Sequence, residues 1–321
     1  MLLRSRKSLL TSIARLPHHV IATGDPESNL TDAVLSLVAV TIGPSVGFQI
    51  RKVHALTQAE PLWRVNHTWL LLHADEPGII DSNIYARGIE TNRIDWSIIR
   101  EWMTHCDLVH SDGCKPNKQL PIPRFRVIDC NTRRIVLVSQ TCKYIALSYV
   151  WGTSKQSSPK LLSTLPSPDV LVVEDAITAT LSIGYRYLWM DQYCIDQSDV
   201  EMKHTLIQNM DKIYQGASMS IVNASGNSAD SGLPGVSLVH RLPQVSVNLE
   251  AYSTGITMIS PIRAEVSAAK WSTRAWTYQQ GLLSRRRLVF ASTQIYFQCE
   301  YMHCCETVSY THLTLPTILR V

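Results

Sequence analysis

A short apolar segment followed at once by acids and amides is the feature that most constrains the fold of this chain. Residues 185–190 are dense in aromatic and large apolar side chains and follow Gly184, which predicts a buried strand. The polar residues just past its carboxyl end are Asp191, Gln192, Asp196 and Gln197. Open α/β sheets carry their functional groups at the carboxyl ends of their strands, so we expect these side chains to lie at such an edge.

Stretches with helical spacing lie on both sides of this strand. Upstream, Val173, Ile177 and Leu181 recur at every fourth residue, and Gly184 stands where a helix would end. The downstream apolar residues at helical spacing are Leu206, Met210, Ile213, Tyr214 and Ala217, and the polar residues opposite them are Lys203, Gln208, Asp211, Lys212 and Gln215. A helix, a strand and a second helix in succession indicate an α/β fold.

Two further segments have the composition of buried strands. Residues 144–152, Y-I-A-L-S-Y-V-W-G, end at a glycine turn and place Ser148, Tyr149 and Trp151 at the end of the strand. Residues 218–224 predict the third strand. Intervening helices favour a parallel sheet with right-handed connections. We therefore expect these three strands to be neighbours, with their polar ends converging on one rim together with Trp276.

Weaker patterns flank this sheet. The predicted hairpins join residues 125–130 to 134–138 and residues 287–291 to 294–299. Residues 271–287 predict a helix that carries Trp276, Leu282 and Leu283 and is interrupted near Gly281.

The first hundred residues form a mixed segment with little pattern. A strand or a helix is expected at residues 34–42, a strand at 69–73 and the start of a helix near Asp95.

Composition limits the classes of function. With 321 residues, 45% of them hydrophobic, the chain can bury a full core in one or two domains. The formal net charge is only +4, and the densest basic cluster, residues 285–287, is not interleaved with aromatic residues. Nucleic-acid binding is therefore not expected. Neither a glycine-rich nucleotide-binding loop nor a serine-hydrolase elbow around Ser148 is present.

The eight cysteines show no even framework, which favours free thiols in a reducing compartment, and the cytoplasm is the expected location. The first twenty residues are basic and resemble an organelle presequence, although a wrongly assigned start is an equal alternative. The apolar segment at residues 33–42 is too short to span a bilayer, so no membrane association is expected.

One aromatic and three potential metal ligands recur at intervals of four residues: Trp102, Cys106, His110 and Cys114. On a helix these side chains would share one face, and a zinc site could use them with His105 or a distant cysteine as fourth ligand. The alternative is that the thiols pack in the core. We favour this alternative and predict no metal, because Gly113 and Pro116 should break the helix and no C-x-x-C pair is present.

Several segments together resemble the fungal heterokaryon incompatibility (HET) domain. The matching segments are Y-I-A-L-S-Y-V-W-G at 144–152, Y-L-W-M-D-Q-Y-C-I-D-Q at 187–197, M-D-K-I-Y-Q-G-A at 210–217, S-G-L at 231–233 and R-A-W-T-Y-Q-Q at 274–280. They follow the order expected for the family. The upstream W-x3-C-x3-H-x3-C segment and L-P-I-P-R-F-R-V-I-D resemble the lead-in of such proteins.

The resemblance implies a fungal cytoplasmic protein that triggers programmed cell death after a non-self encounter. It also implies a TIR-like fold, a parallel sheet flanked by helices, here with a β-hairpin lead-in and the N-terminal mixed segment. Many TIR domains self-assemble, and some cleave NAD with the help of a glutamate that stabilises an oxocarbenium-like transition state.

Two positions depart from the family pattern. Trp276 matches the family's aromatic residue, but Ala275 replaces a glycine and Gln280 replaces the glutamate. Glutamine retains the shape of the side chain and loses the charge. The resemblance therefore implies a poor or inactive hydrolase unless Asp191 or Asp196 supplies the carboxylate.

The sequence thus predicts candidate catalytic residues Asp191, Asp196 and Gln280 and candidate substrate-binding residues Ser148, Tyr149, Trp151, Trp189 and Trp276. The alternatives are a capping role for Asp191, core packing for Trp189 and Trp276, and a buried, inert thiol at Cys194.

The expected organisation is an N-terminal extension (1–120), a hairpin lead-in (121–143), the HET domain (144–290) and a terminal hairpin with a tail (291–321). The tail's last residues, 308–321, resemble a translated adapter at the end of a truncated gene model.

Three functions remain as hypotheses. The first is a signalling module that binds protein partners or forms homo-oligomers, with no cofactor. The second is an NAD glycohydrolase, with NAD as substrate. The third is a metal-dependent regulator built on Cys106, His110 and Cys114.

Overall fold

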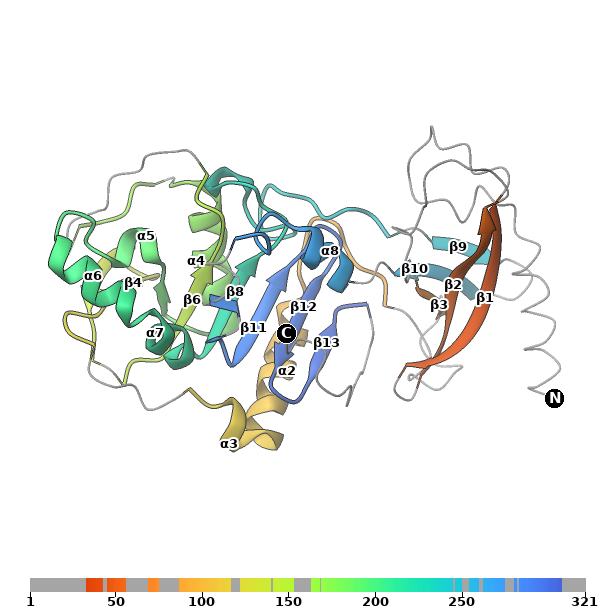
Figure 1. The fold of residues 1–321 in the computed structure, drawn as a ribbon, viewed down its shortest axis with the longest axis horizontal. Helices are drawn as coiled ribbons and strands as arrows, with labels where there is room; N and C mark the ends of the chain where they lie inside the picture. The colour runs from red at the N-terminus through yellow and green to blue at the C-terminus, as the bar shows by residue number, and fades with distance from the viewer. Residues whose placement is uncertain are drawn as a thin grey trace. The chain divides into compact units, whose positions relative to one another are not determined.

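The computed structural model describes residues 33–42, 45–55, 69–74, 87–116, 122–139, 141–152, 163–167, 169–244, 246–249, 254–259, 262–274, 280–281 and 283–307. The chain divides into two compact units (Figure 1). The first comprises Met1–Gly88, Gln244–Ala264 and Thr307–Thr311, and the second comprises Ile89–Pro243, Glu265–Glu306 and His312–Val321. The domain boundaries expected from the sequence stay a prediction.

The first unit contains an antiparallel sheet of five strands in the order β1-β2-β3-β10-β9. The strands are β1 (Ala33–Ile42), β2 (Ser45–Ala55), β3 (Trp69–Ala74), β9 (Ser246–Leu249) and β10 (Thr254–Ile259). The segment at 34–42, for which the sequence left strand and helix open, is a strand, and the strand expected at 69–73 is confirmed.

The second unit is built on an eight-stranded mixed sheet in the order β13-β12-β11-β8-β6-β7-β4-β5. The strands are β4 (Arg126–Asp129), β5 (Arg134–Leu137), β6 (Tyr144–Ser148), β7 (Tyr187–Trp189), β8 (Met219–Asn223), β11 (Arg286–Phe290), β12 (Ile295–Cys299) and β13 (His303–Cys305). The strands β11, β8, β6 and β7 pair in parallel. The three strands predicted around residues 147, 188 and 221 are therefore neighbours, as expected.

Antiparallel hairpins extend this parallel core at both edges. β4 pairs with β7 and β5 on one side, and β12 pairs with β11 and β13 on the other. Both predicted hairpins are thus confirmed, and β13 is an addition that the sequence analysis did not anticipate. All residues of β6 and β8 are buried, as expected for parallel strands at the centre of an α/β sheet flanked by helices.

Helix α4 (Leu171–Ile183) connects β6 to β7 and ends where the sequence predicted. Gly184 has a φ of 98°, and its N–H donates to carbonyls of the last helical turn, a left-handed cap that glycine adopts without strain. Val173 and Ile177 are buried, but Leu181 is 40% exposed. A strict four-residue repeat drifts by about 40° per step around an α-helix, which carries Leu181 away from the core.

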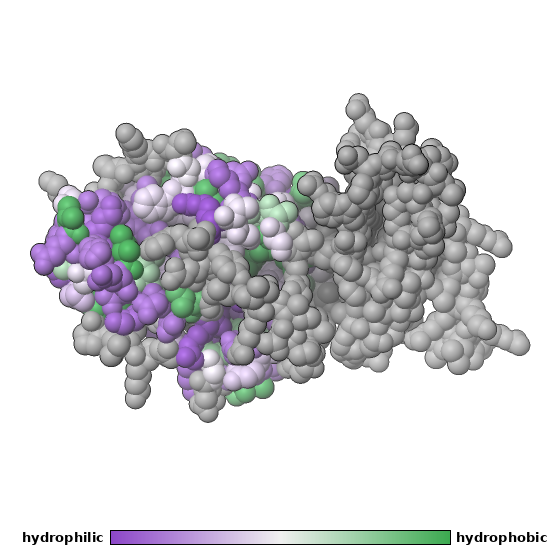
Figure 2. Space-filling view, viewed as in Figure 1, coloured by the Kyte–Doolittle hydropathy of each residue, from purple (hydrophilic) through white to green (hydrophobic). Residues whose placement is uncertain are grey.

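The single helix expected after β7 is two helices, α6 (Val200–Gln208) and α7 (Met210–Gly216). The chain turns at Asn209, whose Nδ2 donates to the Thr205 carbonyl at 2.7 Å. The apolar residues predicted to face the core are nevertheless all buried. Hydrophilic residues gather over α6 and α7 on the face in Figure 2, in agreement with the predicted polar face.

The remaining helices are α2 (Trp96–Val109), α3 (Ser111–Cys114), α5 (Asp191–Cys194), the 3-10 helix η3 (Ala229–Ser231) and α8 (Ile262–Ala268). Asp95 caps α2, since its carboxylate accepts from the Ser97 N–H at 3.0 Å, so the predicted helix start is confirmed. The helix does break, but at His110, and α3 then carries the chain through Gly113 to Cys114. The expectation that Gly113 prevents this was wrong.

The helix predicted over residues 271–287 is wrong at both ends. Residues 280, 281 and 283 are helical, but β11 already begins at Arg286. Residues 271–274 form turns after α8, with the Ser272 N–H donating to the Ala269 carbonyl at 3.0 Å. Trp276 and Leu282 lie outside the described residues, as do the presequence-like start and the adapter-like residues 308–321. Among the residues described, no helix combines the length and apolarity needed to cross a membrane.

Replacing Leu147 by alanine should destabilise the second unit strongly. Leu147 is completely buried in β6, and a buried leucine-to-alanine change costs about 2–5 kcal/mol through lost burial and the cavity left behind. The matched control is Leu137→Ala in the edge strand β5, where the side chain is 52% exposed, with a cost below about 1 kcal/mol. Denaturant unfolding of both variants measures the difference, and equal costs would contradict the central position of β6.

Candidate functional site

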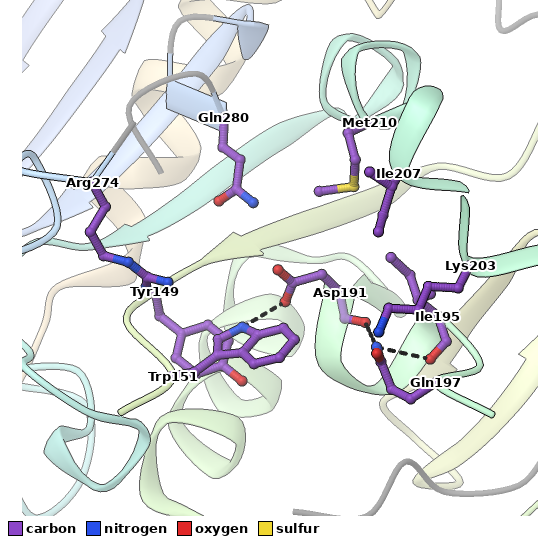
Figure 3. A pocket seen from close by; sticks show the side chains of 10 residues that line it. All are labelled: Tyr149, Trp151, Asp191, Ile195, Gln197, Lys203, Ile207, Met210, Arg274 and Gln280. Atoms are coloured by element: carbon purple, nitrogen blue, oxygen red, sulfur yellow. Dashed lines mark hydrogen bonds between the residues drawn. The ribbon is translucent and has the colours of Figure 1, made fainter. Parts of the chain in front are cut away.

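A cleft of about 260 Å³ lies beyond the carboxyl ends of β6 and β7. Its polar lining comprises Tyr149, Trp151, Asp191, Gln197, Lys203, Arg274 and Gln280, and its apolar lining comprises Ile195, Ile207 and Met210 (Figure 3). The parallel pairing of β6 with β7 brings Trp151 and Asp191 to the same edge. This is the place where open α/β sheets bind ligands.

Asp191 is the one carboxylate among the described residues that line the cleft. Its Oδ1 accepts from the Trp151 Nε1–H at 3.0 Å and from the Gln192 N–H at 2.8 Å. Burial raises the pKa of Asp191 from its ordinary 3.8 to about 6, although these two hydrogen bonds and the charge of Arg274 act in the opposite direction. The group is thus mostly ionised at neutral pH and takes up a proton under mildly acidic conditions.

Gln280 closes another side of the cleft and is held by a chain of hydrogen bonds. The Trp271 Nε1–H donates to Ser148 Oγ at 2.9 Å, and Ser148 Oγ–H donates to Gln280 Oε1 at 2.7 Å. Ser148 and Gln280 are both buried. Ser148 therefore fixes the amide from behind instead of facing the cleft, where it was expected to contact substrate.

A hydrogen bond also holds the side chain of Tyr149 in place. Its hydroxyl donates to Gln192 Oε1, and burial raises its pKa above the ordinary value. The ring therefore stays neutral and forms part of the cleft wall beside Trp151. Both residues line the cleft, as the sequence predicted.

The cleft is also lined by two cationic side chains, Lys203 and Arg274, which the sequence did not predict there. Arg274 is exposed and lowers the pKa of Asp191 by its charge, and Lys203 lies half-buried on α6. Figure 3 shows both side chains extending toward the polar part of the cleft. Arg274 is the first residue of the R-A-W-T-Y-Q-Q segment, so the family resemblance could have pointed to it as a site residue. Nothing in the sequence pattern pointed to Lys203.

Asp196 and Trp189 are not among the described residues that line the cleft. Asp196 accepts from the Ser198 N–H and Oγ–H and pairs with Arg126 at 3.2 Å, and these contacts lower its pKa. Trp189 is 1% exposed and packs edge-on against Tyr214. The alternative of core packing therefore describes Trp189, and Trp276 lies outside the described residues.

A second cavity of about 250 Å³ shares Ile207, Met210 and Gln280 with the cleft. It continues along α7 past Tyr214 and Leu283. Gln280 therefore stands between two adjoining spaces, and a ligand that entered both would pass the amide.

The S-G-L segment at 231–233 is a structural support beneath the rim. The Leu233 N–H donates to Asp175 Oδ2 at 2.6 Å, and Asn223 Nδ2 at the end of β8 donates to the Gly232 carbonyl at 2.7 Å. A Cβ on Gly232, whose φ is 65°, would lie 2.8 Å from Asp175. This position therefore requires glycine.

The structure defines an α/β domain with a cleft at the carboxyl ends of its parallel strands. Residues 144–280 match the family model described as heterokaryon incompatibility protein (HET). The chain therefore carries a HET domain, as the resemblance predicted. Comparison of the whole chain with curated proteins and with solved structures found no match.

The Asp191→Asn substitution should change the pH dependence of the free energy of unfolding. The folded pKa of Asp191 is about 6 against an ordinary 3.8. The folded protein therefore holds this proton more tightly than the unfolded chain, and the associated stability is lost as pH rises from about 4 through 6. Relative to Asp191→Asn, the wild type should lose up to about 3 kcal/mol between pH 4 and pH 7.

Denaturant unfolding at both pH values measures this change. Asp196→Asn is the matched control, because the pKa of Asp196 is lowered and the sign is opposite: its contribution is present above the ordinary pKa and is lost at lower pH. A wild type that gained stability over Asp191→Asn on going to pH 7 would contradict the buried, proton-binding state of Asp191.

Proposed function

We propose that this protein is a signalling module of fungal non-self recognition, which triggers programmed cell death by binding protein partners or by self-assembly in the cytoplasm. The HET match of residues 144–280 supports the family context. The single observation that carries the choice of a non-catalytic module is the neutral amide of Gln280, at the position where the resemblance implies a glutamate.

The contacts of Gln280 explain why the amide suits binding better than cleavage. Its Oε1 accepts from Ser148 at 2.7 Å, so the oxygen that faces Ser148 is already satisfied. A glycosidic bond is broken most readily beside a carboxylate that stabilises positive charge at the reacting carbon. An amide carries no net charge and provides only a dipole for that purpose.

The size of the cleft limits the size of its ligand. At about 260 Å³ it is smaller than the roughly 300–1,000 Å³ typical of small-molecule sites. A whole dinucleotide would also have to occupy the adjoining cavity beyond Gln280. The cleft alone fits a smaller ligand, or one end of a larger one, that would stabilise a signalling state.

Expression of the full chain in a fungus tests this function. The wild type should cause growth arrest and should form oligomers as its concentration increases. Asp191→Asn should kill about as well, because the signal does not depend on chemistry at the carboxylate. Leu147→Ala should kill less than Leu137→Ala, since it reduces the amount of folded domain. A wild type that stays monomeric and harmless would overturn the proposal.

The second candidate function is hydrolysis of NAD, and Asp191 is the observation that favours it. A buried acid whose pKa of about 6 departs far from its ordinary value, in a cleft with Trp151 and Arg274, has the character of a functional carboxylate. Its ionised form could stabilise the oxocarbenium-like transition state. Asp196 suits this role less well, because Ser198 and Arg126 already occupy its oxygens.

The Gln280→Glu variant separates the two functions. If the missing charge disables hydrolysis, the wild type should release no nicotinamide from NAD and Gln280→Glu should gain release. Gln215→Glu on α7 makes the same chemical change away from the cleft lining and should gain nothing. If the wild type already releases nicotinamide, and Asp191→Asn lowers that rate by about 10²-fold or more, hydrolysis replaces the signalling module as the primary function.

A further inference from the structure

Four potential metal ligands that the candidate cleft does not use lie together at another part of the second unit. They are Cys106, His110, Cys114 and Cys299, and their ligand atoms all lie within 4.8 Å of one another. We call these four residues the cysteine–histidine cluster. The three cysteines are at most 3% exposed, and His110 is half-buried.

Local structure aligns the first three residues of the cluster. The His110 N–H donates to the Cys106 carbonyl at 3.0 Å, and the Cys114 N–H donates to the His110 carbonyl at 3.2 Å. These are bonds between residues four apart, as in an α-helix, so the chain keeps a helical path across the break between α2 and α3. The four-residue spacing therefore places all three side chains on one face.

The fourth member comes from a distant part of the sequence. Cys299 ends β12, and its backbone N–H donates to the Met302 carbonyl at 2.9 Å in the turn toward β13. The packing of Trp102 on α2 against Phe297 on β12, with ring centroids 6.1 Å apart, brings the two elements together. As a result, His110 Nδ1 lies 3.6 Å from Cys299 Sγ.

We propose that the cysteine–histidine cluster binds one Zn²⁺ ion as a structural site. In a tetrahedral zinc site, Zn–S bonds of about 2.3 Å place two sulfurs about 3.8 Å apart. The four ligand atoms, which lie within 4.8 Å of one another, reach this geometry by shifts of about 1 Å or less. Three cysteines and one histidine form a ligand set that is common in structural zinc sites.

The charge around the cluster fits a zinc–thiolate centre. Zn²⁺ with three thiolates and a neutral imidazole carries one net negative charge. Arg286 is only 2% exposed and interacts with Cys106, so a buried cation already stands beside the thiols. Its guanidinium also pairs with Asp107 at 2.5 Å. Arg286 thus offsets the remaining charge of the centre in a place that water hardly reaches.

The position of the cluster indicates what the ion would do. Four protein ligands, three of them buried, leave no coordination position for a substrate, so the site is structural rather than catalytic. It joins the helical segment α2–α3 to the terminal hairpin of the sheet through residues 189 positions apart. Such a cross-link stabilises the folded state by the free energy of metal binding.

Metal analysis of the purified full chain, prepared without chelators, tests the proposal directly. The wild type should contain about one zinc per chain, and Cys299→Ser should weaken zinc binding at least about 100-fold in competition with a chelator, more than the loss of an outer-shell contact would. Cys142→Ser removes a half-buried thiol outside the cluster and should keep full zinc content.

A second measurement guards against a variant that fails to fold. Wild-type protein exchanged with Co²⁺ should show the sulfur-to-metal absorption of a thiolate site, and Cys142→Ser should show the same spectrum. Wild-type protein with no more zinc than Cys299→Ser would overturn the proposal. Recovery of the cluster thiols as a disulfide, or their free alkylation in the native state, would do the same.

Discussion

The pairing of β6 between β7 and β8 is the constraint on which the second unit depends. All three strands run parallel, and β6 is buried along its whole length. Every strand of the trio therefore ends at the same edge, and the residues that follow β6 and β7 must share the space beyond it. The cleft exists because the parallel pairing of β6 with β7, two buried apolar strands, holds the polar residues that follow each of them side by side.

The same burial determines the chemistry of the cleft. Asp191 follows directly on β7 and is withdrawn from water, which raises its pKa to about 6 despite two hydrogen bonds that favour its charge. Gln280 is equally buried but is neutral, and it is fixed by Ser148 from the end of β6. Asp191 and Gln280 thus face a common space. Whether the Asp191 carboxylate acts on a substrate beside the neutral Gln280 is the difference between a hydrolase and a binding module.

The cysteine–histidine cluster lies at the edge of the sheet. Cys106, His110 and Cys114, aligned by helical spacing, meet Cys299 at the end of β12, with Arg286 beside them. The cleft depends on parallel pairing, whereas the cysteine–histidine cluster depends on how α2 packs on the terminal hairpin. The two sites are therefore separate consequences of the same fold.

The sequence by itself determined the elements whose pattern is local. Apolar runs and turn residues predicted the three parallel strands, both hairpins and the end of α4 at Gly184. The ordered segments predicted the HET domain at residues 144–280. Each of these signals lies within a few residues. Tyr149, Trp151 and Asp191 were expected at the carboxyl ends of the parallel strands for the same reason, since each lies just past the end of a strand. The helix expected over residues 271–287 was wrong where turns form at 271–274 and where β11 begins at Arg286. The unbroken helix across Asn209 was wrong because the chain turns there.

Only the tertiary structure decided which distant side chains meet. Trp189 is the last residue of β7 and Asp196 follows soon after Asp191. Trp189 nevertheless packs against Tyr214, and Asp196 binds Ser198 and Arg126. The hydrogen bond of Gln280 to Ser148 spans 132 residues, and Cys299 meets His110 across 189. Contacts over such separations leave no local pattern, because they depend on the packing of elements and not on the spacing within any of them.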